Sequence, residues 1–187
     1  MKNVLMVISG PSGVGKGTVV KALLKKREDL ALSISCTTRA PRTGETHGKE
    51  YFFLTREEFE KKISERDFLE YDEHFGNFYG TPKSFVKEQL TEKSVVLEID
   101  VVGGLNAKKE IPETVLVMIV PPSLEELKRR LQGRGTETES EIENRLSRLE
   151  YELSRTGEYD YAVVNDTVEN AVAELEKIIE KEKNKGK

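Results

Sequence analysis

The feature that most constrains this chain is a glycine-rich loop between an apolar run and an amphipathic segment. The apolar run covers residues 4–8, and the loop, GPSGVGKGT, spans Gly10 to Thr18. Glycines allow a tight turn whose backbone N–H groups point inward, and the start of a following helix adds partial positive charge. Lys16 adds a full charge, so the segment predicts a phosphate-binding strand–loop–helix unit rather than a chance turn beside a lysine.

The end of this loop departs from the strict GxxxxGK[ST] pattern. Position 17 is Gly, and the hydroxyl comes one residue later, at Thr18. One residue turns a side chain by about 100° around a helix, so direct coordination of Mg²⁺ by Thr18 is not expected. The same GKGT ending is found in adenylate kinases, and it therefore leaves the phosphate-loop prediction intact.

Short β-branched runs and helical patterns alternate along the chain. The runs predict strands over residues 4–8, 95–99, 115–120 and 161–164, and the helical patterns cover 16–28, 82–91, 123–132, 139–154 and 168–182. The runs are almost continuously apolar, which is typical of parallel strands buried on both faces. We therefore expect an α/β fold of three layers, with a central parallel sheet and helices on both faces.

Two segments interrupt this alternation. Residues 32–81 hold most of the aromatic side chains in short alternating runs, and they predict a small mixed α/β insertion with antiparallel strands. Within it, Thr55 and Glu58 have the spacing of a capping box before a short helix. The same spacing recurs at Ser123 with Glu126, before an irregular stretch over 132–140, and at Thr138 with Glu141, near its end.

Composition excludes several classes of protein. With 30 Lys and Arg against 34 Asp and Glu, the net charge is −4, which argues against a nucleic-acid binder. No apolar stretch approaches a membrane span, and the first apolar run leads into the glycine loop rather than a cleavage site, so we expect no membrane association and a cytoplasmic location. The single cysteine, Cys36, excludes a disulfide framework within one chain.

A second motif follows the first helix. Thr37-Thr38-Arg39 continues through Arg42 and Glu45 to Gly48, Tyr51 and Phe53. This run resembles the signature of the guanylate kinase family, T-[ST]-R-x-x-[KR]-x-x-[DE]-x-x-G-x-x-Y-x-[FY], and meets every fixed position. Further matches extend the resemblance from about residue 2 to about residue 182; they are Glu70, Gly76 to Thr81, Glu98 to Asp100, Gly133 to Thr136 and Val164 to Asp166.

The resemblance implies one guanylate kinase-like domain over residues 1–183. Its core would comprise 1–31, 82–125 and 156–183, its GMP-binding region 32–81 and its helical lid 126–155, with a frayed tail at 184–187. The implied reaction is the Mg²⁺-dependent transfer of the γ-phosphoryl group of ATP to GMP, and to dGMP, giving ADP and GDP. Small-molecule substrates and a monomeric state are expected.

Arg39 and Arg42 lie three residues apart on a loop, so their planar guanidinium groups can converge on one phosphate. Tyr51 and Tyr79 can donate hydroxyls to the same group. The resemblance implies that these four residues hold the phosphate of GMP. Without the signature, solvated arginines and core tyrosines would be the simpler interpretation.

Guanine presents N1–H and N2–H₂ donors where adenine presents none, so a carboxylate facing them would select guanine. The resemblance places Glu70 there, with Ser35, Thr81 and Asp100 completing the pocket. Alternatives remain open for each partner. Ser35 could be structural, Thr81 could cap the helix that follows Pro82, and Asp100 could hold Mg²⁺-bound water.

The resemblance also implies the ATP site and the catalytic set. ATP would contact Gly10, Pro11, Ser12, Gly13, Val14, Gly15, Lys16, Gly17 and Thr18, with Asn165 near adenine and Arg130 and Arg134 on the lid. Asn165 could instead be a strand-end turn residue, and Arg130 an exposed one. Lys16, Arg39, Arg134 and Arg145 would be catalytic, and Mg²⁺ would bind mainly through ATP and water, with Thr18 and Asp100 as candidate outer ligands.

No general base is expected, because the acceptor oxygen is already anionic, and His47 and His74 are interpreted as loop residues. Catalysis would then consist of positioning and charge neutralisation, with lid closure excluding water. Two other hypotheses are weighed against this one. An adenylate kinase is disfavoured by the signature and Glu70, and a non-catalytic module that binds proteins is disfavoured by the intact Gly10, Gly15 and Lys16.

Overall fold

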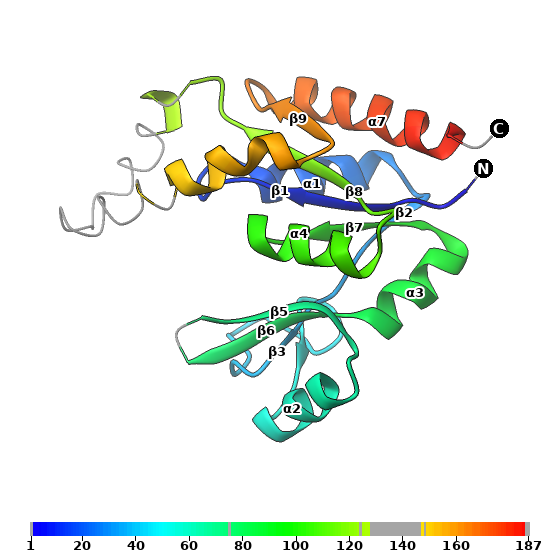
Figure 1. The fold of residues 1–187 in the computed structure, drawn as a ribbon, viewed down its shortest axis with the longest axis vertical. Helices are drawn as coiled ribbons and strands as arrows, with labels where there is room; N and C mark the ends of the chain where they lie inside the picture. Colours follow the sequence, from blue (N-terminus) through cyan, green and yellow to red (C-terminus); the bar gives the residue numbers. More distant parts are fainter. Residues whose placement is uncertain (1, 75, 124, 128–146, 148, 186–187) are drawn as a thin grey trace.

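The computed structural model describes residues 2–74, 76–123, 125–127, 147 and 149–185. Its centre is a five-stranded sheet of order β2-β7-β1-β8-β9, in which every neighbouring pair is parallel (Figure 1). The strands are β1 Leu5–Ser9, β2 Leu30–Leu32, β7 Ser94–Glu98, β8 Val115–Val120 and β9 Tyr161–Val164. The predicted central parallel sheet is confirmed, and its four predicted strands lie within one residue of the expected bounds.

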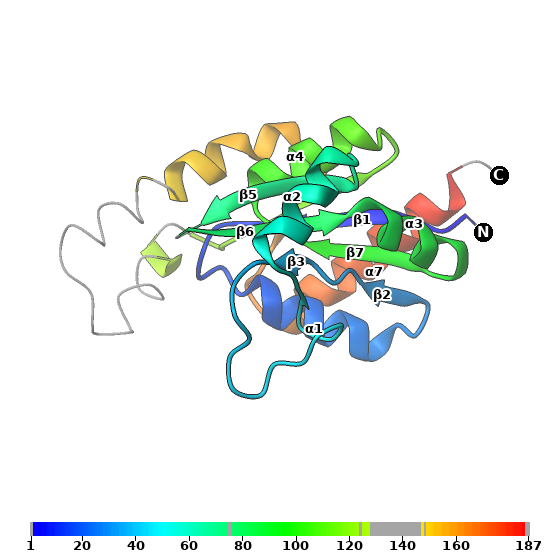
Figure 2. The same cartoon turned by 90° about the horizontal axis from the view of Figure 1, so that it is seen from below.

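Helices cover both faces of this sheet, as the continuous apolar runs predict. On one face, Met6 and Ile8 pack with α1 (Lys16–Lys26) and α7 (Val168–Asn184). On the other face, Leu5 and Val7 pack with α3 (Lys83–Glu92) and α4 (Val101–Glu110). Figures 1 and 2 show these layers from the side and from below.

Helix α4 was not among the predicted helices. It follows β7 directly and contains Gly103 and Gly104, which lower helix propensity by about 1 kcal/mol each relative to Ala. Its buried residues include these two glycines and Ala107, so no stripe of large apolar side chains marks it in the sequence. A second difference concerns Leu32, which was expected to open the insertion but ends β2, a strand of the core sheet paired with β7.

Residues from Cys36 to Pro82 form the insertion, with a sheet of order β4-β3-β6-β5 and one helix. Its elements are β3 Cys36–Thr37, β4 Phe52–Phe53, α2 Arg56–Ser64, β5 Phe68–His74 and β6 Asn77–Pro82. Strand β6 is antiparallel to β3 and β5, but β3 and β4 are parallel, so the expectation of antiparallel strands was wrong for that pair. The loop over 38–51 is long enough for the crossover of about a dozen residues that a parallel pair requires.

The capping box at the start of α2 is confirmed. The Thr55 hydroxyl accepts a hydrogen bond from the Glu58 N–H at 3.1 Å, and the Glu58 carboxylate accepts one from the Thr55 N–H at 2.7 Å. Helix α2 then places Phe59, which is fully buried, between the rings of Phe68 and Phe78 at 4.4 and 5.2 Å. These rings give the insertion a small core of its own.

Most of the predicted lid over 126–155 lies outside the described residues, including the Thr138–Glu141 capping box. Residues 125–127 and 149–154 are helical, and the Glu126 N–H donates to the Ser123 hydroxyl at 3.1 Å. A short 3-10 helix, η1 (Arg155–Glu158), then leads to β9. Helix α7 includes Asn184, one residue into the predicted frayed tail.

Candidate active site

The glycine loop leaves β1 at the carboxyl edge of the core sheet, and α1 begins at Lys16. Gly10 and Gly15 have φ angles of 154° and 91°, a backbone region that side chains disfavour. A Cβ on Gly10 would also lie 2.4 Å from the Ile119 carbonyl oxygen. Val14 is fully buried and anchors the loop in the core. The loop conformation thus requires glycine at these positions and is held by packing against the core.

Asn165, which follows β9, contacts the glycine loop through its side-chain amide. Its side chain is 5% exposed, and its amide nitrogen donates to the Val14 carbonyl oxygen at 2.7 Å. A Cβ on Gly15 would lie 2.6 Å from that nitrogen. The contact with adenine stays a prediction, and the side-chain amide bonds to the loop backbone, a role that the sequence pattern did not indicate. The two residues are 151 positions apart, so no local pattern links them.

Lys16 lies between the loop and the end of β7. Its ammonium nitrogen is 3.4 Å from the Gly10 carbonyl oxygen and 3.5 Å from that of Ile99. Both contacts are long for hydrogen bonds. Among the other loop residues predicted to contact ATP, Pro11 is buried, Gly17 is half-buried, and Ser12, Gly13 and Thr18 are exposed.

Glu98 is a further candidate site residue; it belongs to the family resemblance, but the sequence indicated no role for it. It is the last residue of β7, and a Cβ on Gly17 would lie 3.1 Å from its carboxylate oxygen Oε1. The bare Gly17 therefore leaves room for this acid beside the loop. Asp100 serves differently, because its Oδ1 accepts the Gly103 N–H at 2.7 Å and caps α4. Both acids leave the same edge of the sheet, two residues apart.

Three of the four residues predicted for the acceptor phosphate lie together on the insertion. The Arg39 guanidinium carbon is 5.6 Å from the centre of the Tyr51 ring, and the rings of Tyr51 and Tyr79 are 6.1 Å apart. Burial raises the pKa of the Tyr51 hydroxyl, and the neighbouring Tyr79 raises it further. Arg42 is exposed at the edge of this cluster.

Glu45 accepts hydrogen bonds from the Arg39 side chain and from the Arg42 backbone. Its two carboxylate oxygens each lie 2.9 Å from Nη2 of Arg39, and Oε2 also accepts the Arg42 N–H at 2.8 Å. That backbone N–H, with help from Arg39, lowers the pKa of the Glu45 carboxyl. An anionic ligand would therefore replace one anion with another. Glu45 was quoted in the signature, but its place opposite Arg39 depends on the fold of the loop.

Glu70 and Thr81 face each other across β5 and β6. The Thr81 hydroxyl, fully buried, donates to Glu70 Oε1 at 2.6 Å. A register shift between Phe68 and Glu70 re-aims the strand here, as bulges beside functional sites often do. On the other side, a Cβ on Gly103 would lie 3.0 Å from Glu70 Oε2, so this carboxylate lies against the first turn of α4.

The alternative role for Thr81 as a helix cap is wrong. Helix α3 begins after Pro82, and the Thr81 hydroxyl is committed to Glu70. The start of α3 is instead bonded by Asp67, whose Oδ1 accepts the Ser84 N–H at 2.8 Å.

Burial raises the pKa of Glu70 to about 7, and the nearby Asp100 raises it further while the Thr81 hydroxyl opposes the shift. The carboxylates of Glu70 and Asp100 thus lie close together, and a ligand that donates hydrogen bonds would stabilise their ionised forms. Ser35 precedes β3 and is half-buried, and its backbone oxygen accepts the Phe52 N–H at 2.9 Å. The role of its hydroxyl in the base pocket stays a prediction.

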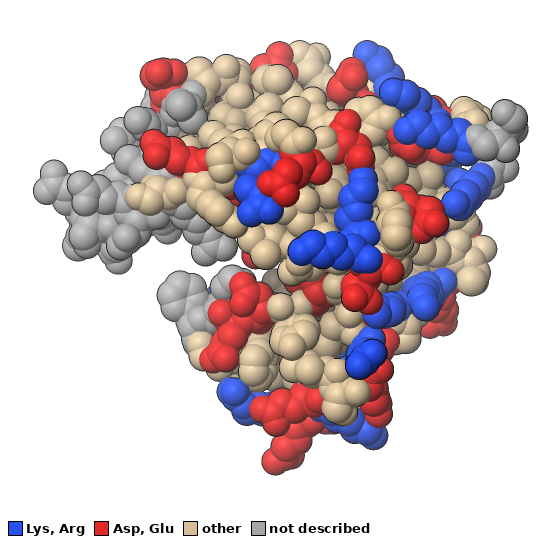
Figure 3. Space-filling view, viewed as in Figure 1, with Lys and Arg blue, Asp and Glu red and all other residues tan. Residues whose placement is uncertain are grey.

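The loop and the insertion cluster adjoin. Glu98, beside the loop, is near enough to Tyr51 to contribute to the raised pKa of its hydroxyl, after burial and Tyr79. Figure 3 shows the surface indented between the core and the insertion, with acidic side chains along the insertion's side. Arg130, Arg134 and Arg145 lie outside the described residues, so their predicted roles stay predictions.

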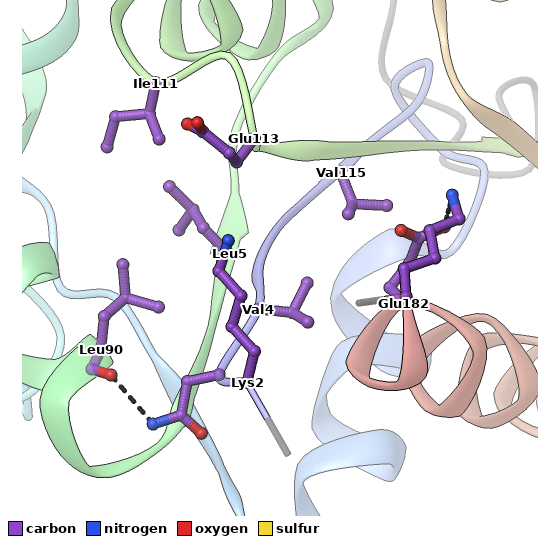
Figure 4. Close-up of a pocket in the computed structure, with 10 residues that line it drawn as sticks. Lys2, Val4, Leu5, Leu90, Ile111, Glu113, Val115 and Glu182 are labelled. Atoms are coloured by element: carbon purple, nitrogen blue, oxygen red, sulfur yellow. Dashed lines mark hydrogen bonds and ion pairs between the residues drawn. The ribbon is translucent and has the colours of Figure 1, made fainter. Parts of the chain in front are cut away.

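A cavity of about 490 Å³ lies elsewhere, at the amino ends of β1 and β8 (Figure 4). Val4, Leu5 and Val115 line it, and the Asn3 amide donates to the Leu90 carbonyl oxygen at 2.9 Å along one wall. Because parallel strands present the phosphate loop at their carboxyl ends, this cavity is at the opposite edge of the sheet from the candidate active site.

A glycine-rich loop at the carboxyl edge of a parallel sheet, adjoining a cluster of arginine and tyrosine side chains on an insertion, is typical of phosphate-loop kinases. The comparisons agree. The guanylate kinase family model matches residues 2–182, and the chain belongs to the guanylate kinase family. The predicted enzyme class, an ATP:GMP phosphotransferase, is thereby confirmed.

Individual relatives give the same result. The guanylate kinase of Clostridium perfringens is 52% identical, covering 97% of this chain and 85% of that protein. That of Caldanaerobacter subterraneus subsp. tengcongensis is 51% identical, covering 97% and 89%. The crystal structure of guanylate kinase from Anaplasma phagocytophilum matches with a TM-score of 0.77 at 34% identity, covering 99% of this chain and 88% of that one. A shikimate kinase from Bacteroides thetaiotaomicron, covering 95% and 98% at 16% identity and a TM-score of 0.53, shares the fold alone.

Among the helices described, none combines the length and the apolar character that crossing a bilayer requires. The cytoplasmic location and the monomeric state stay predictions.

Proposed function

We propose that the protein transfers the γ-phosphoryl group of ATP to GMP and dGMP, and that Glu70 selects the guanine base. The observation that carries this proposal is the placement of Glu70 between the Thr81 hydroxyl and the first turn of α4, near Asp100. A carboxylate there can accept the N1–H and N2–H₂ donors of guanine, whereas adenine would leave it unpaired. A carboxylate that loses its partners on burial carries a large free-energy cost, which is the source of the selectivity.

The acceptor phosphate is assigned to Arg39, Arg42, Tyr51 and Tyr79. The support for this assignment is that Glu45 already presents two anionic oxygens to Arg39 and to the Arg42 backbone. A phosphate offers more oxygens and more charge, so it can take over Arg39 while the tyrosine hydroxyls add donors. Glu45 would then hold Arg39 in place between turnovers.

The triphosphate is assigned to the loop from Gly10 to Thr18, whose N–H groups and Lys16 supply positive charge. The chain also offers oxygen donors of the kind Mg²⁺ prefers, namely the Thr18 hydroxyl and the carboxylates of Glu98 and Asp100. Of these, Glu98 has the strongest support because it borders the loop at Gly17. When bound with ATP, Mg²⁺ would neutralise charge on the phosphates.

The chemistry assigned to the side chains is positioning and charge neutralisation. The attacking atom is a phosphate oxygen of GMP, so no group has to remove a proton from it. Lys16 and Arg39 would stabilise the negative charge shared between donor and acceptor. Arg134 and Arg145 are proposed to add charge from the lid, and Arg130 to contact ATP, on the strength of the family resemblance.

A panel of nucleoside monophosphates tests the proposal. With ATP and Mg²⁺, kcat/KM should be highest for GMP and dGMP and at least about a hundredfold lower for AMP, CMP and UMP. A preference for AMP would overturn the assignment of Glu70 to guanine. Absence of ATP consumption with every acceptor would instead indicate a non-catalytic module.

A further inference from the structure

The first turn of α4 lies between two groups of side chains, and two consecutive glycines make this possible. Gly103 faces the proposed guanine site, where an added Cβ would lie 3.0 Å from Glu70 Oε2 and 3.3 Å from Asp100 Oδ1. Gly104 faces away from it, where a Cβ would lie 2.5 Å from the Tyr159 hydroxyl oxygen. At these two positions only backbone separates the two groups of side chains.

Tyr159 is built into the core behind this turn. It lies between η1 and β9, is 9% exposed, and its hydroxyl donates to the Val101 carbonyl oxygen at 3.1 Å. Burial raises the pKa of this hydroxyl to about 12, so it keeps its proton and remains a donor. Ser9, fully buried at the end of β1, donates in parallel to the Asp100 carbonyl oxygen at 3.0 Å. The hydroxyls of Ser9 and Tyr159 thus donate hydrogen bonds to the carbonyl groups of two consecutive residues at the start of α4.

We propose that Tyr159 is a positioning residue for the guanine site: its hydroxyl fixes the first turn of α4, and so the Asp100 carboxylate and the helix surface against which Glu70 lies. This inference rests on the proposed function, because it takes Glu70 and Asp100 as the groups that meet the base. It deepens that function by naming what holds them in register.

The physical argument concerns precision. Asp100 is the N-cap of α4, so its carboxylate moves whenever the first turn moves. Val101 packs in the core, but Gly103 and Gly104 give the rest of this turn no side chain to hold it. Binding groups displaced by about 1 Å lose much of their effect. The Tyr159 hydroxyl supplies the directional contact that apolar packing lacks.

The test is Tyr159→Phe, which removes only the hydroxyl, with Tyr161→Phe as the matched control. The Tyr161 hydroxyl bonds to Glu182 on α7, away from α4. By calorimetry, Tyr159→Phe should weaken GMP binding about fivefold, the effect of one hydrogen bond. ATP binding should change less than about twofold. The preference for GMP over inosine monophosphate, which lacks the N2 donors, should fall by a similar factor, and Tyr161→Phe should leave all three measurements unchanged.

Gly104→Ala provides a second, independent variant. Its Cβ would press on the Tyr159 hydroxyl, and on Val7 and Ser9 at 3.0 and 3.1 Å, so GMP binding should weaken more than in Tyr159→Phe. In the double variant Tyr159→Phe/Gly104→Ala the closest contact is removed, so the two effects should be clearly less than multiplicative.

The binding measurements distinguish failure of the proposed function from failure of the role proposed for Tyr159. If wild-type protein binds ATP but not GMP, the proposed function fails and this inference with it. If wild-type protein binds GMP normally, two results overturn the inference alone: an unchanged GMP affinity in Tyr159→Phe, or an equal weakening of ATP and GMP together with a lowered melting temperature.

Discussion

The two regions proposed to bind phosphate, the glycine loop and the cluster around Arg39, are built from different parts of the chain. The phosphate loop offers backbone N–H groups, and its shape is held by the buried Val14 and by the Asn165 amide. The acceptor cluster offers side chains, and Glu45 already occupies its Arg39. The loop is shaped by its glycines and by the core, whereas in the cluster an internal carboxylate bonds to the arginine that is proposed to bind the acceptor phosphate.

This difference extends to the packing beneath each region. The loop stands on the core of the central sheet, whereas the insertion has a much smaller core around Cys36, Phe59 and Phe68. Segments with few buried apolar contacts open at a lower free-energy cost. We expect loss of Lys16 in the loop to affect turnover strongly, and loss of Glu70 in the insertion to affect mainly the binding of the acceptor.

The largest effect should come from Lys16→Ala. This substitution removes a full charge from the loop, so kcat should fall by at least about a hundredfold while the melting temperature changes little. Steady-state kinetics and thermal unfolding measure both. Lys21→Ala, an exposed lysine on the same helix, is the matched control and should keep its activity. A loss of only a few-fold in Lys16→Ala would contradict the role of Lys16.

A smaller and more selective effect is expected from Glu70→Gln. The amide cannot supply two acceptor oxygens, so KM for GMP should rise about thirtyfold, equivalent to about 2 kcal/mol, with KM for ATP within about twofold. Glu73→Gln, on the exposed part of the same strand, should behave as wild type. Equal effects on both substrates would show that Glu70 supports the fold rather than the base.

The raised pKa of Glu70 predicts a dependence on pH. Since only the ionised carboxylate accepts the guanine donors, GMP affinity should rise about tenfold from about pH 6 to about pH 8, as a group of pKa about 7 ionises. The phosphate of GMP itself titrates near pH 6, and Glu70→Gln, which retains that titration, isolates the part due to Glu70. An identical pH profile in both proteins would remove Glu70 from the explanation.

The same shift has a consequence for stability. A carboxyl whose pKa is raised on folding binds its proton more tightly in the folded state. Its contribution to the free energy of unfolding is therefore present below the unfolded pKa near 4.5 and declines as pH rises through about 7. Bound GMP should reverse this decline, because the ligand supplies partners for the ionised form.

Much of the fold could be predicted because the relevant signals are local. Four core strands and helices α1 and α7 appear as apolar runs and helical periodicity, and the loop appears as glycine spacing. Helix α4 could not be found in this way, since Gly103 and Gly104 give it neither propensity nor an apolar stripe. The direction of β4 relative to β3 depends on how the long intervening loop returns, which no periodicity records.

The site divides in the same way. The side chains proposed for the acceptor phosphate come from the loop over 38–51 and from β6, and their shared role was implied only by the family resemblance. The contact of Glu98 with Gly17 and that of Glu45 with Arg39 depend on the folded chain, so their roles could not be derived from spacing. Backbone binding sites are thus readable from sequence, whereas side-chain sites need either the structure or a resemblance.

The smallest effect is expected from Asn165→Ala, which tests how the glycine loop is held in its conformation. Asn165→Ala removes the bond to the Val14 carbonyl oxygen, so KM for ATP should rise about fivefold while KM for GMP stays within about twofold. Asn170→Ala, which removes an exposed amide on α7, is the matched control.

Comparing ATP with GTP as the donor distinguishes two roles for Asn165. If the amide anchors the loop, both donors should weaken equally, because both carry the same triphosphate. A loss confined to ATP would show instead that Asn165 contacts the adenine, and the preformed loop would then have to be held by Val14 and the glycines alone.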